Sequence, residues 1–492
     1  MPTQIHKKDA EIAILLFVST SFLTWYLSAA YFTISLDEGI YTYGGYRIAA
    51  GGIVYKDFTA FVGPILYWME GLLYQLFGND LTKLRLSSAA SIGSICTGVY
   101  FFANSIAGRT AGLLASLSWF AVSLDLPNRM EVNHRWLSMA FYALAGAMLI
   151  ASPAASRVGN CIAGCLLGAA IFTTPSFVYP AAILGVYLFF RDRSRFLPYL
   201  VGGILSCSLV TSILLWQGAL TPFLEQLRWA AENYVQANHF PFGRFAWPVP
   251  TRLLLQVYLG AICIPLSLMT AGLYFVWRRD LPLEFPVVFC LALIAASYPK
   301  WDAFSLFFIS APYFGLAFAI AFSLVPDALR SLVRGLLVAF LTYNLINAWT
   351  LPNRLTRIPT RGGVLMGESE NALAIQNLEN AIPRKSKVFV YPYMSGLYTV
   401  LDVQNPTRFE FLQPGMMTAG DEANVLADLR KSPPDFIFWQ SLSDEDIRRI
   451  WPSSNPDRHR FRLLEQWIRE GYEQGLGISE SNIRHSVWAK KR

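Results

Sequence analysis

Long apolar runs alternate with short polar connections over the first 350 residues of the chain. Most runs approach the ~20 residues that an α-helix needs to cross the hydrocarbon core of a bilayer. The pattern predicts a polytopic α-helical membrane protein with about eleven spanning helices, at Ile12–Ile34, Leu84–Ala103, Ala111–Leu124, Trp136–Ala151, Val158–Phe172, Ser176–Phe190, Phe196–Trp216, Leu253–Val276, Leu283–Ser297, Phe304–Val325 and Leu332–Trp349.

Basic residues concentrate in alternate, mostly short connections between the predicted spans. These connections hold Lys7, Lys8, Arg109, Arg157, Arg191, Arg193, Arg195, Arg278, Arg279, Arg330 and Arg334. Because the cytoplasmic loops of membrane proteins are enriched in Lys and Arg, we predict that these connections are cytoplasmic. The opposite connections, and everything after Thr350, are then predicted to lie on the outer side of the membrane.

The first outer connection, Ser35–Lys83, has the pattern of helices rather than of a loop. One helix is predicted from Asp37 to about Ala50, and a second over Pro64–Phe77 after a Gly-Gly break. The second is amphipathic and rich in aromatic residues, so it is predicted to lie along the membrane surface. The aromatic connection Gln217–Arg252 is predicted to form a partly helical lid at the lipid surface.

After Leu351 the composition changes to that of a soluble domain. The patterns there predict short strands and helices at Lys387–Tyr391, Glu422–Arg430, Asp435–Trp439, Arg462–Glu470 and Ser486–Ala489. We therefore predict two domains, a transmembrane domain over residues 1–350 that contains the candidate residues described below and a small extracytoplasmic α/β domain over residues 351–492.

Composition and charge narrow the classes of function. Hydrophobic residues make up 54% of the chain and charged residues 15%, which is too apolar for a soluble protein of this length. The net charge of +7 comes from clusters in short loops, so we expect it to set orientation rather than to bind nucleic acid. No P-loop, Rossmann glycine pattern, HExxH or GxSxG motif is present in a suitable context, which argues against ATP-driven transport and serine hydrolysis.

Two carboxylates, Asp37 and Glu38, follow the first predicted span at the membrane boundary. A capping box with Ser35 and the helix dipole can explain Glu38 completely. Asp37 is not needed for capping, and a carboxylate partly shielded from water is suited to take a proton from a hydroxyl group. Both are candidate catalytic residues, and Tyr41 lies one helical turn beyond Asp37 on the same face.

The other candidate residues lie in the outer connections. They are candidates for binding substrate or a donor phosphate: Tyr41, Tyr55, Asp57, Tyr67, Arg129, Glu131, His134, Arg135, Lys300 and Asp302. A purely structural role is the alternative for each of them. The Tyr residues can lie at the membrane interface, an Asp can cap a loop, an Arg can extend its side chain to the membrane boundary, and Lys300 with Asp302 can form a salt-bridged anchor. Asp37, Glu131 and Asp302 can in principle gather around a divalent metal ion, a hypothesis that spacing alone leaves open.

Collected in order, these features resemble the GT-C superfamily of membrane glycosyltransferases. The resemblance is strongest to the bacterial branch related to protein O-mannosyltransferases and the lipid A aminoarabinose transferase. It rests on Asp37-Glu38-x-x-Tyr41, Ala50-Gly51-Gly52, Pro64-x-x-Tyr67-Trp68, Leu76-Phe77-Gly78, Tyr391-Pro392 and Asn405-Pro406-Thr407-Arg408. Two positions depart from the aminoarabinose transferases, Ile40 in place of an Arg and Gly63 in place of a Lys, so the phosphate contacts of that branch do not carry over.

The resemblance implies an activity. In relatives the Asp of the first outer loop acts as the general base or next to it, which maps onto Asp37, and the donor is a sugar on a polyprenyl phosphate. The expected function is inverting transfer of that sugar to a lipid, glycan or protein of the envelope, on the outer face of the bacterial inner membrane. The alternatives are a transporter or lipid flippase without glycosyl transfer, and a non-catalytic scaffold whose soluble tail recruits envelope proteins.

Overall fold

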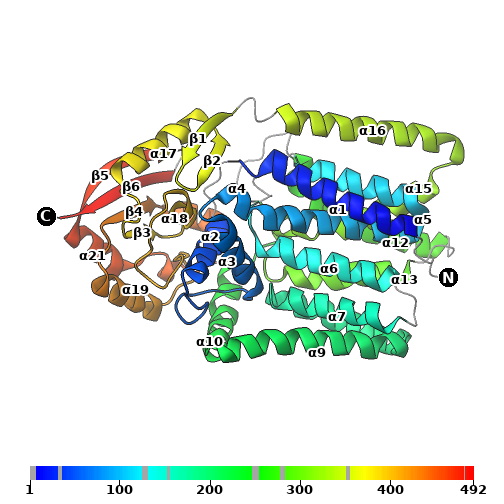
Figure 1. Ribbon diagram of the computed structural model, residues 1–492, viewed down its shortest axis with the longest axis horizontal. Helices are drawn as coiled ribbons and strands as arrows, with labels where there is room; N and C mark the ends of the chain where they lie inside the picture. Colours follow the sequence, from blue (N-terminus) through cyan, green and yellow to red (C-terminus); the bar gives the residue numbers. More distant parts are fainter. Residues whose placement is uncertain are drawn as a thin grey trace.

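The computed structural model describes residues 7–31, 36–124, 131–151, 156–245, 254–277, 283–350, 355–480 and 483–491. Figure 1 shows a bundle of long helices in one half of the molecule and a mixed α/β unit in the other. The chain begins in the bundle and ends in the α/β unit, and the short helices α2 and α3 lie between the two halves. The molecule is a mostly helical, polytopic membrane protein.

Five described helices are long and apolar enough to cross a membrane: α1 (Lys7–Ser28), α5 (Leu86–Leu124), α9 (Arg193–Trp216), α12 (Leu254–Trp277) and α16 (Asp327–Thr350). The shorter helices of the bundle are α6 (His134–Ala151), α7 (Arg157–Ile171), α8 (Val178–Arg191), α13 (Glu284–Ile294), α14 (Ala303–Phe308) and α15 (Ser310–Leu324). Every predicted span therefore overlaps a helix, although Ile12–Ile34 extends past the end of α1 and partly outside the described residues, and Phe304–Val325 covers both α14 and α15. The number of helices that cross the membrane stays a prediction.

The element α5 is a helical hairpin rather than one long rod. Gly108 has φ +83° and ψ 172°, a left-handed conformation that glycine adopts without strain. Contacts pair residues on either side of this turn, since the Ser116 hydroxyl donates to the Cys96 carbonyl oxygen at 2.8 Å. The two predicted spans Leu84–Ala103 and Ala111–Leu124 are the two antiparallel arms, with Arg109 at the turn.

The connection after α1 folds as two packed helices, α2 (Leu36–Ala49) and α3 (Ile65–Phe77), followed by the short α4 (Leu81–Leu84). Both helices were predicted at nearly these bounds. On α3, Leu66 and Tyr67 are buried while Leu72 and Leu76 are exposed. The exposed apolar side chains fit a helix that lies against lipid.

The connection after α9 forms a short helical arm. It consists of α10 (Leu220–Trp229), one turn of π-helix, η3 (Ala230–Tyr234), and α11 (Val235–Ala237). We call residues 217–245 the lid. Its far side is held by the α/β unit, because the Trp229 indole donates to Asp421 Oδ2 at 3.2 Å and Arg458 donates to Asn233 Oδ1 at 2.8 Å.

The C-terminal unit is built around one sheet in the order β3-β4-β6-β5, with β3 and β4 parallel and the other neighbours antiparallel. Its strands are β3 (Val388–Tyr391), β4 (Phe436–Ser441), β5 (Tyr472–Glu480) and β6 (Ile483–Lys490), and a separate hairpin is formed by β1 (Thr356–Thr360) and β2 (Gly363–Gly367). Its helices are α17 (Ser369–Ala381), α18 (Gly396–Val400), α19 (Ala419–Lys431), α20 (Asp444–Ile450) and α21 (Arg462–Gly471).

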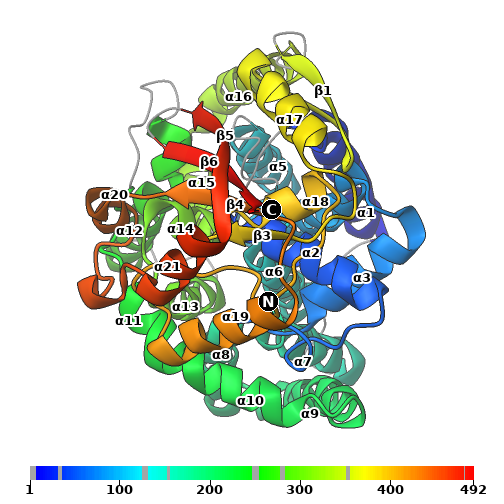
Figure 2. The ribbon, with the colours of Figure 1, turned by 90° about the vertical axis from the view of Figure 1, so that its left-hand side faces the viewer.

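Helices cover both faces of this sheet. Figure 2, a view onto the C-terminal unit, shows the strands between α17 and α18 on one side and α19 and α21 on the other. Successive side chains of β3 point to opposite faces of the sheet, and each face carries its own hydrophobic core. Val388 and Val390 pack toward α17 and α18, while Phe389 and Tyr391 pack toward α19 and α21. The strands and helices predicted for this segment are present at or near the predicted positions.

The C-terminal unit is seated directly on α2. A Cβ atom at Gly39 would lie 2.0 Å from the Gly396 backbone nitrogen, so only glycine permits this approach. The Tyr43 hydroxyl accepts from the Asn405 N–H at 2.6 Å, and Arg47 Nε lies 2.9 Å from Glu410 Oε1 in a buried ion pair. As a result, the two halves of the molecule share α2.

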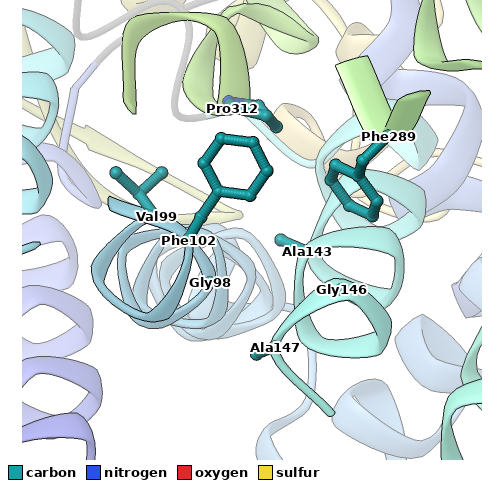
Figure 3. Close-up of a pocket in the computed structure, with 8 residues that line it drawn as sticks. All are labelled: Gly98, Val99, Phe102, Ala143, Gly146, Ala147, Phe289 and Pro312. Carbon is teal, nitrogen blue, oxygen red and sulfur yellow. The ribbon is translucent and has the colours of Figure 1, made fainter. Parts of the chain in front are cut away.

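The centre of the bundle contains a small apolar crevice of about 10 Å³ between α5, α6, α13 and α15 (Figure 3). Gly98 and Gly146 line it together with the rings of Phe102 and Phe289. A volume of this size holds at most about one water molecule, and the lining offers a water no polar side chain. We therefore assign it to helix packing, where small residues let backbones approach closely.

Replacing Gly98 with Val is expected to destabilise the bundle. The added Cβ atom would lie 2.6 Å from the Ala143 Cβ atom, and overpacking of this kind costs ~1–3 kcal/mol. Gly272→Val on α12 is the matched control, because no atom lies within 4 Å of its added Cβ. Thermal unfolding in detergent should show a lower midpoint for Gly98→Val only. Equal midpoints for the two variants would contradict the packing argument.

Candidate active site

A cavity of about 390 Å³ lies where the helix bundle, α2 and α3, the lid and the C-terminal unit meet. Its wall includes six of the residues predicted from the sequence: Asp37, Tyr41, Tyr67, His134, Arg135 and Lys300. These residues come from three different connections between predicted spans. Tertiary folding thus brings a carboxylate, two phenols, an imidazole and two cations to one cavity.

Asp37 stands in the first turn of α2, partly buried, with its carboxylate at the cavity wall. The Asn133 amide donates to Asp37 Oδ2 at 3.1 Å, and Asn133 itself is buried. The open N–H groups of the first helical turn also favour a negative charge at this position. The carboxylate is therefore held in place at the cavity wall.

Aromatic rings surround this carboxylate. The Tyr41 ring lies 5.5 Å from the Tyr67 ring and 5.6 Å from the His134 ring, measured between centroids. Burial, reinforced by the charge of Asp37, raises the pKa of the Tyr41 phenol well above its ordinary value. Tyr41 is thus a neutral hydroxyl donor, and His134 Nδ1 is held 2.7 Å from the Thr174 hydroxyl.

Two cations, Arg135 and Lys300, line the same cavity. Burial disfavours the charge of the Lys300 ammonium and lowers its pKa. The carboxylate of Asp302, with Nζ and Oδ2 3.8 Å apart, outweighs this effect together with Tyr234 and Asp37, so the pKa of Lys300 is raised. The Arg135 guanidinium lies 6.0 Å from the centre of the Phe308 ring. Two fixed positive charges facing one cavity are suited to hold a phosphate group.

Glu38 does not line the cavity. Its carboxylate forms a two-point ion pair with Arg85, with Arg85 Nη2 and Nε donating to its two oxygens at 2.6 and 2.7 Å, and both side chains are 3% exposed. Its Oε1 atom also accepts from the Val132 N–H at 3.2 Å. Glu38 therefore orients α2 and the segment before α6 rather than facing a substrate in this cavity.

The other predicted site residues lie outside the cavity wall. The Tyr55 hydroxyl donates to the Val62 carbonyl oxygen at 2.5 Å, and Asp57 is exposed and accepts from the Ile53 N–H at 2.7 Å. Glu131 is buried beside α5, where Ser88 donates to its carbonyl oxygen. Asp302 caps α14 through the Ser305 N–H at 2.6 Å. Arg129 lies outside the described residues.

Several cavity residues were not predicted from the sequence. Thr174 comes from the turn before α8, Tyr234 and Asn238 come from the lid, and Gln413 and Trp451 come from the C-terminal unit. None of them belongs to a motif or to a charged cluster. Only the general prediction of an aromatic lid over Gln217–Arg252 pointed toward any of them.

The proposed metal ligands do not gather. Over the residues that the structure describes, no three His, Cys, Asp or Glu side chains lie close enough together to hold a metal ion. Asp37 lines the cavity, whereas Asp302 caps a helix and Glu131 packs beside α5.

Comparison with known proteins identifies the fold. No protein-family model matches the sequence, and no curated protein matches it. Among solved structures, the chain is similar to ArnT from Cupriavidus metallidurans bound to undecaprenyl phosphate, with a TM-score of 0.59 and 13% identity over 97% of each chain. It is also similar to the mycobacterial arabinofuranosyltransferase AftD, with a TM-score of 0.52 and 13% identity, covering 100% of this chain and 40% of AftD.

A third similar structure is the oligosaccharyltransferase of Archaeoglobus fulgidus, with a TM-score of 0.50 and 12% identity over 86% of this chain and 67% of that one. All three are membrane glycosyltransferases. With 12–13% identity, these structures show that the fold is similar. The predicted resemblance to the GT-C superfamily is therefore confirmed for the fold. The chain has the fold of a GT-C membrane glycosyltransferase.

Glu38→Gln is expected to destabilise the protein by about 3 kcal/mol, because removing one partner of a buried ion pair leaves the Arg85 charge without compensation. Glu232→Gln is the matched control, since the Arg228–Glu232 pair is largely exposed and such pairs contribute ~0–1 kcal/mol. Denaturation in detergent should separate the two variants clearly. A Glu38→Gln protein as stable as the control would show that the ion pair does not stabilise the fold.

The buried Glu70 on α3 predicts a pH dependence of stability. Burial raises the pKa of Glu70 from 4.5 to about 8, with Ser87 lowering it in part and Glu38 raising it further. Between these two pH values the unfolded chain has lost this proton and the folded chain keeps it. The protonated Glu70 side chain therefore contributes its full stabilisation of the folded state below pH 4.5, and this contribution is lost as the pH rises to about 8. The free energy of unfolding falls by at most ~1.4 kcal/mol per pH unit over this range.

Glu70→Gln should remove this dependence. We expect the free energy of unfolding of the variant, relative to wild type, to increase from pH 5 to pH 8, as measured by denaturation at a series of pH values. Parallel pH curves for the two proteins would be inconsistent with a protonated Glu70 in the folded state.

Proposed function

We propose that this chain is an inverting glycosyltransferase. It transfers a sugar from a polyprenyl phosphate to a hydroxyl of an envelope lipid, glycan or protein, on the outer face of the bacterial inner membrane. The observation that carries the proposal is the single cavity that holds the Asp37 carboxylate together with the cations Arg135 and Lys300. Such a cavity supplies a base for the incoming hydroxyl and positive charge for the departing phosphate.

The reaction follows from these roles. Asp37 accepts the proton of the acceptor hydroxyl while the hydroxyl oxygen forms a bond to the anomeric carbon of the sugar. The bond between that carbon and the phosphate oxygen breaks on the opposite face, so the configuration inverts. The electron pair leaves with the polyprenyl phosphate, and Arg135 and Lys300 stabilise the negative charge as it develops.

Two further observations support a lipid-linked donor. The ArnT structure with the same fold was solved bound to undecaprenyl phosphate. In this chain, the apolar residues Val178, Leu227 and Val235 line the cavity that contains the cations, so one space offers surface both for a prenyl chain and for its phosphate. A phosphate-linked sugar also supplies the free energy of transfer without a nucleotide.

Glu38 takes a positioning role in this proposal. Through Arg85 it fixes the first turn of α2, and Asn133 then holds the neighbouring Asp37 in the cavity. His134 is held by Thr174, and its ring packs against Tyr41 beside the carboxylate. These contacts leave Asp37 as the carboxylate at the described wall of the cavity, and we assign the role of general base to it.

Asp37→Asn is expected to reduce sugar transfer by about 10²–10⁴-fold, because the amide cannot accept the hydroxyl proton. Membranes carrying the variant would be incubated with an envelope extract, and consumption of polyprenyl-phosphate sugar would be followed by mass spectrometry of the lipids. Asp57→Asn is the matched control, since Asp57 is exposed and lies outside the cavity wall, and it should retain wild-type transfer.

Full transfer by Asp37→Asn at wild-type expression would refute the assigned base. A transporter or flippase instead predicts that lipid moves across proteoliposomes and that no sugar is transferred by wild type or by either variant. Consumption of the donor by wild type and Asp57→Asn alone would support both the donor class and the role of Asp37.

A further inference from the structure

An amide pair joins the lid to the C-terminal unit at the cavity wall. Gln413 Nε2 donates to Asn238 Oδ1 at 3.3 Å, and Asn238 Nδ2 donates to the Tyr234 carbonyl oxygen at 3.1 Å. Both residues line the cavity, although Asn238 is only 2% exposed and Gln413 only 4%. The position of the Gln413 side chain is thus fixed from the lid side.

The carbonyl oxygen of this Gln413 side chain remains available. Among the described residues, none donates a hydrogen bond to Gln413 Oε1. Gln413 lines the cavity, so its amide oxygen can accept a hydrogen bond from a donor group of a bound ligand. The site therefore calls for a ligand group that carries a hydrogen atom on oxygen or nitrogen.

The pair lies on the side of the cavity where the phosphate is expected. Asn238 follows Tyr234 by one helical turn, and Tyr234 is close enough to Lys300 and Tyr41 to contribute to the raised pKa of both. Phe411 and Trp451 line the same cavity from the C-terminal unit. Aromatic faces beside a fixed amide offer a sugar ring both an apolar contact and a hydrogen-bond acceptor.

The chemistry of the substrates selects one occupant for this acceptor. An ionised phosphate carries only acceptor oxygens, and a prenyl chain carries no polar hydrogen, so neither satisfies Gln413 Oε1. The acceptor hydroxyl that reacts is directed to Asp37. The hydroxyl groups of the sugar on the donor are donors, and they must lie inside the cavity in every productive complex.

We propose that Gln413, held by Asn238, is a specificity-determining residue that accepts a hydrogen bond from a hydroxyl of the transferred sugar. The proposal rests on the function proposed above and extends it, because the C-terminal unit then takes part in choosing the sugar. Removal of this acceptor would leave the base and the cations in place. It should therefore change which sugar is preferred more than whether transfer occurs.

The test uses the full-length protein and a panel of undecaprenyl phosphates that carry glucose, galactose, mannose, xylose or arabinose. Members of the panel differ in the configuration of their hydroxyl groups or in the presence of a hydroxymethyl group. The kcat/KM for each sugar is measured with the envelope extract as the source of acceptor. Wild type should prefer one sugar. In Gln413→Leu, kcat/KM for that sugar should fall by about 10–100-fold while the other sugars change by less than about threefold, so that the preference disappears.

Two further variants keep the test decisive. Gln413→Asn retains an amide but withdraws it by one carbon, so it should lose the same preference even if Gln413→Leu does not fold. Gln440→Leu is the matched control, because Gln440 is a 2% exposed amide on β4 of the same unit that does not line the cavity. It should keep the sugar preference of wild type.

The outcomes separate this proposal from the one on which it rests. Transfer by wild type with an unchanged preference in the Gln413 variants would overturn the role of Gln413 and leave the glycosyltransferase proposal standing. Equal use of all five sugars by wild type would also overturn it. Failure of wild type to consume any member of the panel would count against the proposed function, and this inference would fall with it.

Discussion

The buried ion pair between Glu38 and Arg85 fixes the geometry on which the cavity depends. Successive residues of an α-helix point about 100° apart, so a helix that directs Glu38 into the bundle must direct Asp37 elsewhere. In this structure Asp37 then meets Asn133 at the cavity wall. Because the cost of burying two charges is offset only when both partners are present, the pair ties α2 to one orientation.

A second buried ion pair fixes the other end of the same helix. Near the end of α2, Arg47 meets Glu410 of the C-terminal unit. Near its start, the close approach at Gly39 leaves no space for a side chain between α2 and α18. One helix of fourteen residues is therefore held by the bundle at its start and by the C-terminal unit near both of its ends. Any shift of the C-terminal unit would be transmitted to the helix that carries Asp37.

This arrangement explains why the cavity is shared among distant parts of the sequence. The carboxylate comes from the connection after the first predicted span, and the cations come from two later connections. The amides of Asn238 and Gln413 come from the lid and the C-terminal unit. Two hydrogen bonds join the lid to the C-terminal unit: Trp229 donates to Asp421, and Arg458 donates to Asn233. A lipid-linked sugar enclosed there would contact all of these parts at once.

The sequence alone determined the secondary-structure elements and the reactive side chains available in the connections between the predicted spans. Apolar runs of membrane length predicted the helices of the bundle, and alternation predicted strands such as β3 and β4, because burial of apolar side chains is a local property of the pattern. The order of motifs also predicted the fold and the candidate Asp37. The tertiary structure alone decided that Glu38 is buried against Arg85, that Asp57 faces solvent, and that Gln413 reaches the cavity. Those outcomes depend on contacts between residues that are distant in sequence, and no local pattern encodes them.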